Sequence, residues 1–83
     1  MKTHKIIKVE WEDIASYGGW RETDSTKECN PFSCISCGIE TRVKKGNLGL
    51  MQSVSEGMGK CSEVLVIPRK AIKKIRVLST FKR

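Results

Sequence analysis

Short runs of branched and aromatic residues, separated by polar or glycine-rich segments, make up most of this 83-residue chain. The first run, residues 5–11, has the composition of a half-buried β-strand and ends at Trp11. From residue 12 to 30 the pattern keeps no period and contains Tyr17-Gly18-Gly19-Trp20. We therefore expect one strand followed by a long loop that carries two aromatic side chains.

The middle of the chain predicts a hairpin. Pro31 donates no backbone hydrogen bond, so we place the second strand after it, at residues 32–44. Gly46-Asn47 then supplies the turn chemistry that reverses the chain into a third run, Leu48 to Val54. A second glycine-containing turn, residues 56–60, leads to the next strand.

The last third predicts two more strands and one helical turn. Residues 61–67 end in a continuous apolar run, Val64 to Ile67, which favours the central strand of a sheet. Pro68 ends this strand and suits the start of a single helical turn that ends at Ala71. Apolar spacing in the final segment fits both helix and strand, and we place a strand at residues 74–79.

These elements predict an all-β fold: a small five-stranded SH3-like or Sm-like barrel with a long first loop and one helical turn before its last strand. Closing the barrel would also remove exposed sheet edges. The length allows a single domain, residues 1–83. A core, a deep pocket and a catalytic site would compete for the same few apolar side chains, so we expect a binding protein and not an enzyme.

Charge is distributed unevenly along the chain, whose formal net charge is +7. Six of the nine acidic residues lie between residues 10 and 28, whereas the last fifteen residues contain basic side chains and no acidic ones. Two interpretations stay open: a basic face for nucleic acid, an anionic ligand or an acidic partner, and a solvated surface. The candidate nucleic-acid-binding or anion-binding residues are Lys44, Lys45, Arg69, Lys70, Lys73, Lys74 and Arg76.

The four cysteines allow two incompatible interpretations. Cys34 and Cys37 have the spacing of a zinc knuckle, and Cys29 and Cys61 would have to complete the site. If residues 32–44 form a strand, however, Cys34 and Cys37 point to opposite faces and cannot share one ion. We expect buried cysteines and no metal or cofactor, with a zinc site as the alternative.

Location and chemistry are also constrained. No apolar stretch is long enough to span a membrane, and the segment after Met1 lacks the apolar core of a secretory signal peptide. We therefore expect a cytoplasmic protein with no membrane partner. His4 is expected to be a mobile residue near the terminus. No motif pairs it, as a general base, with a serine or cysteine nucleophile. Trp11 suits the core, whereas Trp20 suits a core lid and an exposed contact equally.

Several short motifs together resemble a group of small, uncharacterised phage and prophage proteins. They are Trp11-x-Asp13, Gly19-Trp20, Pro31 with Ser36-Cys37-Gly38, and Ile67-Pro68-x-x-Ala71-Ile72-x-x-Ile75 with Leu78, covering roughly residues 6 to 78. The resemblance implies a small β-barrel with an accessory role inside an infected bacterial cell and no enzymatic activity. Cys34 and Cys37 stand where the relatives carry valine-like residues, which favours burial over metal binding.

The expected function is therefore non-enzymatic: an accessory protein that binds a host factor through its long aromatic loop and basic surface, with Tyr17, Trp20 and Arg21 as the partner-binding residues. One alternative is a nucleic-acid-binding or nucleotide-binding barrel, including a ring-shaped homo-oligomer of the kind that Sm-like barrels often form. The other is a zinc-stabilised interaction module.

Overall fold

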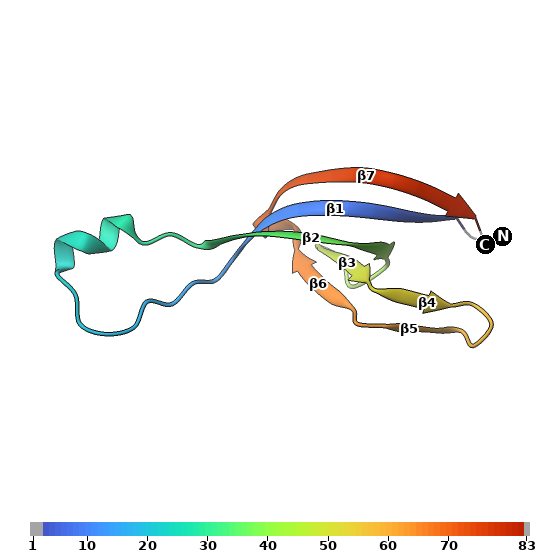
Figure 1. Ribbon diagram of the computed structural model, residues 1–83, viewed down its shortest axis with the longest axis horizontal. Helices are drawn as coiled ribbons and strands as arrows, with labels where there is room; N and C mark the ends of the chain where they lie inside the picture. Colours follow the sequence, from blue (N-terminus) through green and yellow to red (C-terminus); the bar gives the residue numbers. More distant parts are fainter. Residues whose placement is uncertain (1–2, 83) are drawn as a thin grey trace.

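The structure, a computed structural model, describes residues 3–82; Met1, Lys2 and Arg83, which belong to the predicted domain, lie outside the described residues. The chain forms a strongly bent antiparallel sheet from which one long loop projects (Figure 1). Two short 3-10 helices, η1 (Thr23–Glu28) and η2 (Arg69–Ala71), accompany the strands. The strands are β1 (Thr3–Asp13), β2 (Phe32–Thr41), β3 (Asn47–Met51), β4 (Ser53–Ser55), β5 (Lys60–Ser62), β6 (Leu65–Pro68) and β7 (Ile72–Lys82). The expected all-β class and the helical turn before the last strand are confirmed.

Five strands form the main sheet in the order β6-β3-β2-β1-β7, and each pairs antiparallel with its neighbours. Strands β4 and β5 form a separate two-stranded hairpin. Strands β6 and β7 are the edges, and no pairing between them occurs in the described part of the chain. The five-stranded sheet is therefore present, while its closure into a barrel stays a prediction.

The third and fourth predicted strands are each divided in two. The run predicted from Leu48 to Val54 breaks at Gln52, whose backbone N–H donates to the Ser62 carbonyl at 3.0 Å. The run predicted at residues 61–67 breaks at Glu63, which has a positive φ of 54°. These paired interruptions let the β4–β5 hairpin leave the main sheet, and local composition gives no sign of them.

The prediction that residues 61–67 contain the central strand is wrong. Among residues 3–82, strand β6 pairs with β3 alone and lies at the edge of the sheet. Ile67 is fully buried, but Leu65 and Val66 remain 40% and 49% exposed. A continuous apolar run shows that a strand carries apolar side chains on both faces, but not which strands lie beside it.

Strand ends also differ from the predicted ranges. Strand β2 ends at Thr41 and not at residue 44, because the chain already turns at residues 42–46 and the Asn47 N–H donates to the Lys44 carbonyl at 3.2 Å. Strands β1 and β7 extend beyond residues 5–11 and 74–79, since they pair with each other over almost their whole lengths. Long-range pairing thus sets the lengths of these strands.

The core lies in the bend of the sheet and is small. It consists of Ile7, Val9, Leu48, Leu50 and Ile67, with Trp11, Ala71 and Ile72 packed against it. The Trp11 indole N–H donates to the Ser36 hydroxyl at 3.0 Å, so its one polar atom has a partner. The expected packing of Trp11 on the core is therefore confirmed.

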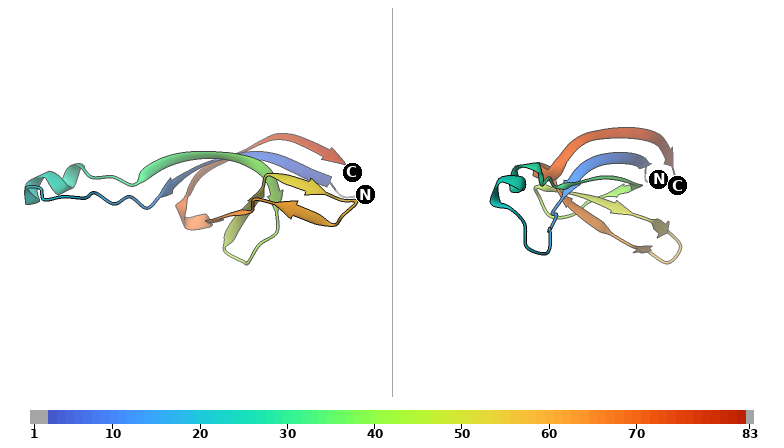
Figure 2. Two further views of the ribbon diagram at one scale, coloured as in Figure 1. Left: turned by 60° about the horizontal axis from the view of Figure 1, so that its bottom comes forward. Right: turned by 60° about the vertical axis from the view of Figure 1, so that its left-hand side comes forward.

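The segment between β1 and β2, residues 14–31, projects away from the sheet, and we call it the arm. It leaves the sheet at the end opposite the two termini and contains η1 near its far end (Figures 1 and 2). Because of the arm the described molecule measures 57 × 23 × 20 Å. The long loop expected from residue 12 to 30 is thus an elongated extension and does not fold over the core.

Candidate interaction surfaces

Two of the predicted partner-binding residues hold the sides of the arm together. The Tyr17 hydroxyl donates to the Asn30 carbonyl at 2.7 Å, which links the outgoing and returning chains. Arg21 lies over the Tyr17 ring at 5.5 Å, and its guanidinium donates to the Cys29 sulfur at 3.4 Å. The centroid of the Phe32 ring lies 6.5 Å from that of the Tyr17 ring. Tyr17 and Arg21 thus form a brace within the arm.

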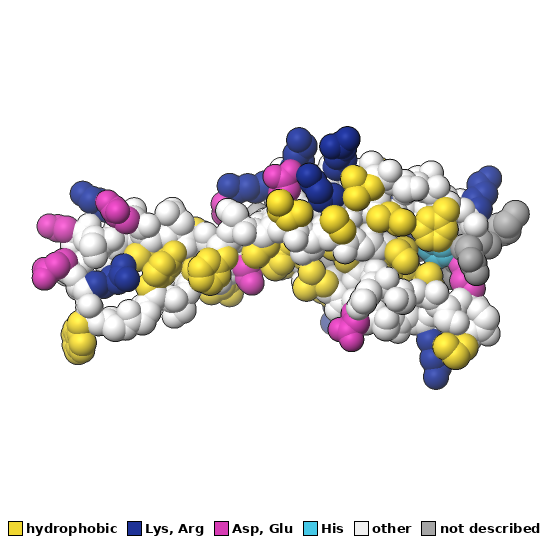
Figure 3. Space-filling view, viewed as in Figure 1, with side chains coloured by type: hydrophobic (Ala, Val, Ile, Leu, Met, Phe, Trp, Pro, Cys, Tyr) yellow, Lys and Arg dark blue, Asp and Glu magenta, His cyan; other side chains and the backbone are white. Residues whose placement is uncertain are grey.

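The third residue, Trp20, is free of the brace. Its exposed fraction is 105%. It follows Gly19, whose φ of 81° is a backbone conformation that glycine adopts readily and most other residues avoid. Ile14, at the start of the arm, is 88% exposed. Figure 3 shows apolar side chains along the arm and acidic ones near its end. Trp20 is therefore exposed and does not form a lid on the core, while its role as a binding residue stays a prediction.

The predicted basic residues do not form one surface. Lys44, Lys45 and Arg69 line a hollow of about 470 Å³ between the β2–β3 turn and η2, which we call the cation hollow. The Arg69 N–H donates to the Gly46 carbonyl at 3.0 Å and so fixes η2 beside the turn. Arg42, which the sequence did not single out, lines the same hollow, together with one carboxylate, that of Glu40.

The other basic residues lie along β7, apart from Lys70 on η2, and acidic residues of β1 accompany them. The Lys73 amine forms an ion pair with the Glu12 carboxylate at 2.7 Å. The hydrogen bond that the Lys73 amine donates to the Glu12 carboxylate, the negative charge of Glu12 and the negative charge of Glu10 raise the pKa of Lys73. Lys74 lies opposite Glu10 and Arg76 opposite Lys8 in the β1–β7 register. Figure 3 shows this mixture of basic and acidic side chains over β7. The β7 group is therefore partly neutralised.

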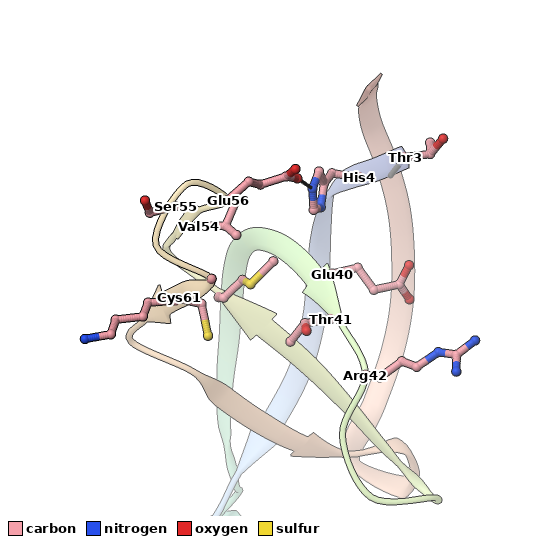
Figure 4. A pocket seen from close by; sticks show the side chains of 12 residues that line it. Thr3, His4, Glu40, Thr41, Arg42, Val54, Ser55, Glu56 and Cys61 are labelled. Carbon is pink, nitrogen blue, oxygen red and sulfur yellow. Dashed lines mark hydrogen bonds and ion pairs between the residues drawn. The ribbon is translucent and has the colours of Figure 1, made fainter. Parts of the chain in front are cut away.

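His4 differs from its expected mobile state. It is 8% exposed, its Nε2 lies 2.5 Å from a Glu56 carboxylate oxygen, and its ring lies 5.2 Å from that of Phe81. The pair joins β1 to the turn of the β4–β5 hairpin at one side of a hollow of about 730 Å³ (Figure 4). No local sequence pattern predicts this contact, because 52 positions separate the two partners.

The cysteines follow the alternation of a strand. In β2, Cys34 is half-buried opposite Trp11, whereas Cys37 is exposed opposite Lys8. Cys61 is also exposed, so the expectation of buried sulfur atoms is wrong for Cys37 and Cys61. Within residues 3–82 no group of three or more His, Cys, Asp or Glu side chains is placed to hold a metal ion. The arrangement gives the zinc alternative no support.

Among the described residues, no helix is long and apolar enough to cross a membrane. Comparison of the chain with protein-family models, with curated proteins and with solved structures found no match in any of the three. The resemblance to small phage proteins therefore stays a prediction from the sequence.

Proposed function

We propose that this chain is a non-enzymatic interaction module that captures a partner protein with its arm. The observation that carries the proposal is the full exposure of Trp20 on an extension whose two sides are held together by Tyr17 and Arg21. Tryptophan is enriched among the residues that dominate binding energy at interfaces. An exposed tryptophan on a braced arm is therefore suited to be the anchor.

Magnitudes support this assignment. Burying 150–250 Å² of an aromatic side chain at about 25 cal/mol per Å² gives roughly 4–6 kcal/mol before the costs of association. The brace lowers one of those costs, because contacts from Tyr17 to Asn30 and from Arg21 to Cys29 order the arm before a partner arrives. Trp20 and Ile14 would contribute apolar contacts with the partner, and the arm's acidic residues would lie at the solvent-exposed rim of the interface.

The test compares what the wild-type chain and two variants retain from a bacterial lysate. Trp20→Ala should weaken retention of a specific partner at least tenfold, since anchor residues contribute about 2 kcal/mol or more. Ile35→Ala is the matched control, because Ile35 is 67% exposed but lies on β2, away from the arm. Equal retention by wild type and Trp20→Ala would contradict the proposal.

The fold and setting belong to the same proposal. The strand order, the long connection after β1 and the helical turn η2 before β7 support a sheet of the SH3-like or Sm-like barrel kind. The sequence motifs support a phage or prophage accessory protein acting on a host protein in the bacterial cytoplasm. A partner identified in the retention experiment would test that setting directly.

The cation hollow favours a second candidate function, the binding of a phosphate group of a nucleic acid or a nucleotide. Four cations, Arg42, Lys44, Lys45 and Arg69, face one carboxylate there. None of these cations takes part in an ion pair within the described residues. Unpaired basic side chains around a hollow are what phosphate contacts require.

Salt dependence tests this candidate. If about four phosphates are neutralised, the affinity for a labelled oligothymidylate should fall with salt with a log–log slope of about 3. The double variant Lys45→Gln/Arg69→Gln should lower that slope by about 1.4, whereas Lys74→Gln/Arg76→Gln, which removes equal charge from β7, should leave it unchanged. Equal effects of the two variants, or a flat salt response, would remove the candidate.

A further inference from the structure

The β4–β5 hairpin has little packing to fix its position. Its two strands form a sheet of their own and, among residues 3–82, pair with no strand of the main sheet. All three residues of β5 are exposed, and in β4 only Val54 and Ser55 are half-buried. A hairpin of such short strands has little stability of its own. Its position relative to the main sheet (Figure 1) therefore depends on few contacts.

Both connections from the hairpin to the main sheet are interrupted at the same level. Gln52 separates β3 from β4, and Glu63 follows β5 on the returning chain. The Gln52 N–H donates to the Ser62 carbonyl at 3.0 Å, so the two breaks lie side by side. Glu63 holds a φ of 54°, a strained conformation that few residues other than glycine adopt. Adjacent breaks at the ends of strands are the usual form of a hinge.

Hollows separate the hairpin from the sheet. The largest, of about 730 Å³, is lined by Val54 and Cys61 on the hairpin and by Thr41 and Met51 on the sheet side (Figure 4). A second hollow, of about 280 Å³, lies between Val54 and Phe81 of β7. Close-packed protein interiors contain few voids of this size. The hairpin therefore has room to move relative to the sheet.

One side-chain contact joins the tip of the hairpin to β1. Glu56 begins the hairpin turn, at the end far from Gln52 and Glu63. Its carboxylate oxygen lies 2.5 Å from Nε2 of His4, which is 8% exposed and packs against the Phe81 ring. In Figure 4 the two side chains point toward each other at one side of the hollow. A hydrogen bond to a carboxylate at the tip opposes rotation about the two breaks.

We propose that the β4–β5 hairpin is a hinged lid, which turns as one body about Gln52 and Glu63 and is held closed by the His4–Glu56 contact. In the closed position Met51, on the sheet side of the hollow, is 6% exposed. Opening separates Glu56 from His4 and uncovers Met51, which gives molecules from solvent access to the hollow. The lid lies at the end of the sheet opposite the arm (Figure 1), and the proposal does not depend on partner capture by the arm.

Relaxation-dispersion NMR of the backbone amides tests the proposal. Residues 53–62 should share one exchange rate on the μs–ms timescale, and paired residues of β1 and β2 should show no exchange at that rate. Glu56→Gln removes the charge from the contact and should raise the population of the open state about fivefold or more. Glu22→Gln, which removes the same charge from the arm, should leave the exchange unchanged.

His4 gives a second readout in the wild-type protein, which needs no variant to fold. It is the single histidine of the chain, so its imidazole signals are identified directly and should report the exchange rate of the hairpin. Three results would overturn the proposal. They are absence of exchange in residues 53–62 of both wild type and Glu56→Gln, different rates for β4 and β5, and equal exchange in β1 and β2.

Discussion

At the scale of single residues, close contacts in the bend of the sheet limit what the core accepts. Gly49 on β3 is buried, and a Cβ placed there would lie 2.6 Å from a Val43 methyl carbon and 2.9 Å from the Thr41 carbonyl oxygen. The backbone oxygen cannot rotate away as a side chain can. The absence of a side chain at Gly49 therefore permits the close approach of β3 to the end of β2.

Gly49→Ala should lower the free energy of unfolding by about 1–3 kcal/mol, because the added methyl group overpacks this contact. Gly57→Ala, in the β4–β5 turn, is the control, since no atom lies within 4 Å of the added Cβ and its φ is not positive. Urea unfolding at one protein concentration measures both. Equal free energies of unfolding for Gly49→Ala and wild type would contradict the close approach of β3 to the end of β2.

Sequence reasoning at this scale succeeded where a residue's own strand decides its environment. Trp11 at the end of an apolar strand packs on the core as expected. Whether the Trp20 side chain is buried or exposed could not be predicted, because the glycines on its N-terminal side interrupt any periodic pattern that would indicate which way it points. His4 was missed because its partner, Glu56, is distant in sequence and no local pattern connects them.

At the scale of elements, alternation along β2 is the firmest connection between sequence and structure. The strand predicted after Pro31 exists, and Cys34 and Ser36 are half-buried whereas Ile35 and Cys37 are exposed. The breaks at Gln52 and Glu63 could not be predicted, since they arise from the pairing of two distant segments. For the same reason the edge position of β6 was not visible in its apolar sequence.

Thiol labelling of the native protein should distinguish the cysteines by exposure. Cys37 and Cys61 are expected to react with iodoacetamide faster than Cys34, which lies half-buried on the inner face of β2. Peptide mass analysis after short labelling gives the order. Because the geometry separates Cys34 from Cys37, added zinc should protect neither; joint protection would restore the zinc interpretation and contradict the strand.

At the scale of the whole molecule, a small core supports two kinds of uncovered apolar surface. One is the arm with Trp20, and the other is the pair of free edges, β6 and β7. The sequence predicts the long aromatic loop, which is present, and a closed barrel, which no pairing within the described residues confirms. Because the pairing of a last strand depends on sheet curvature and not on composition, the sequence alone does not decide closure, which stays a prediction.

The central claim is that Trp20 is open to solvent in the free chain and becomes the anchor of a bound partner. Fluorine NMR of protein labelled with 5-fluorotryptophan gives one signal for each of Trp11 and Trp20, assigned with Trp20→Ala. In the free chain, the fluorine chemical shift of Trp20 should change when light water is replaced by heavy water, as expected of an indole exposed to solvent. Addition of the retained partner should shift or broaden that signal and leave Trp11 unchanged. A shielded Trp20 in the free chain, or a Trp20 signal that the partner does not alter, would contradict the account.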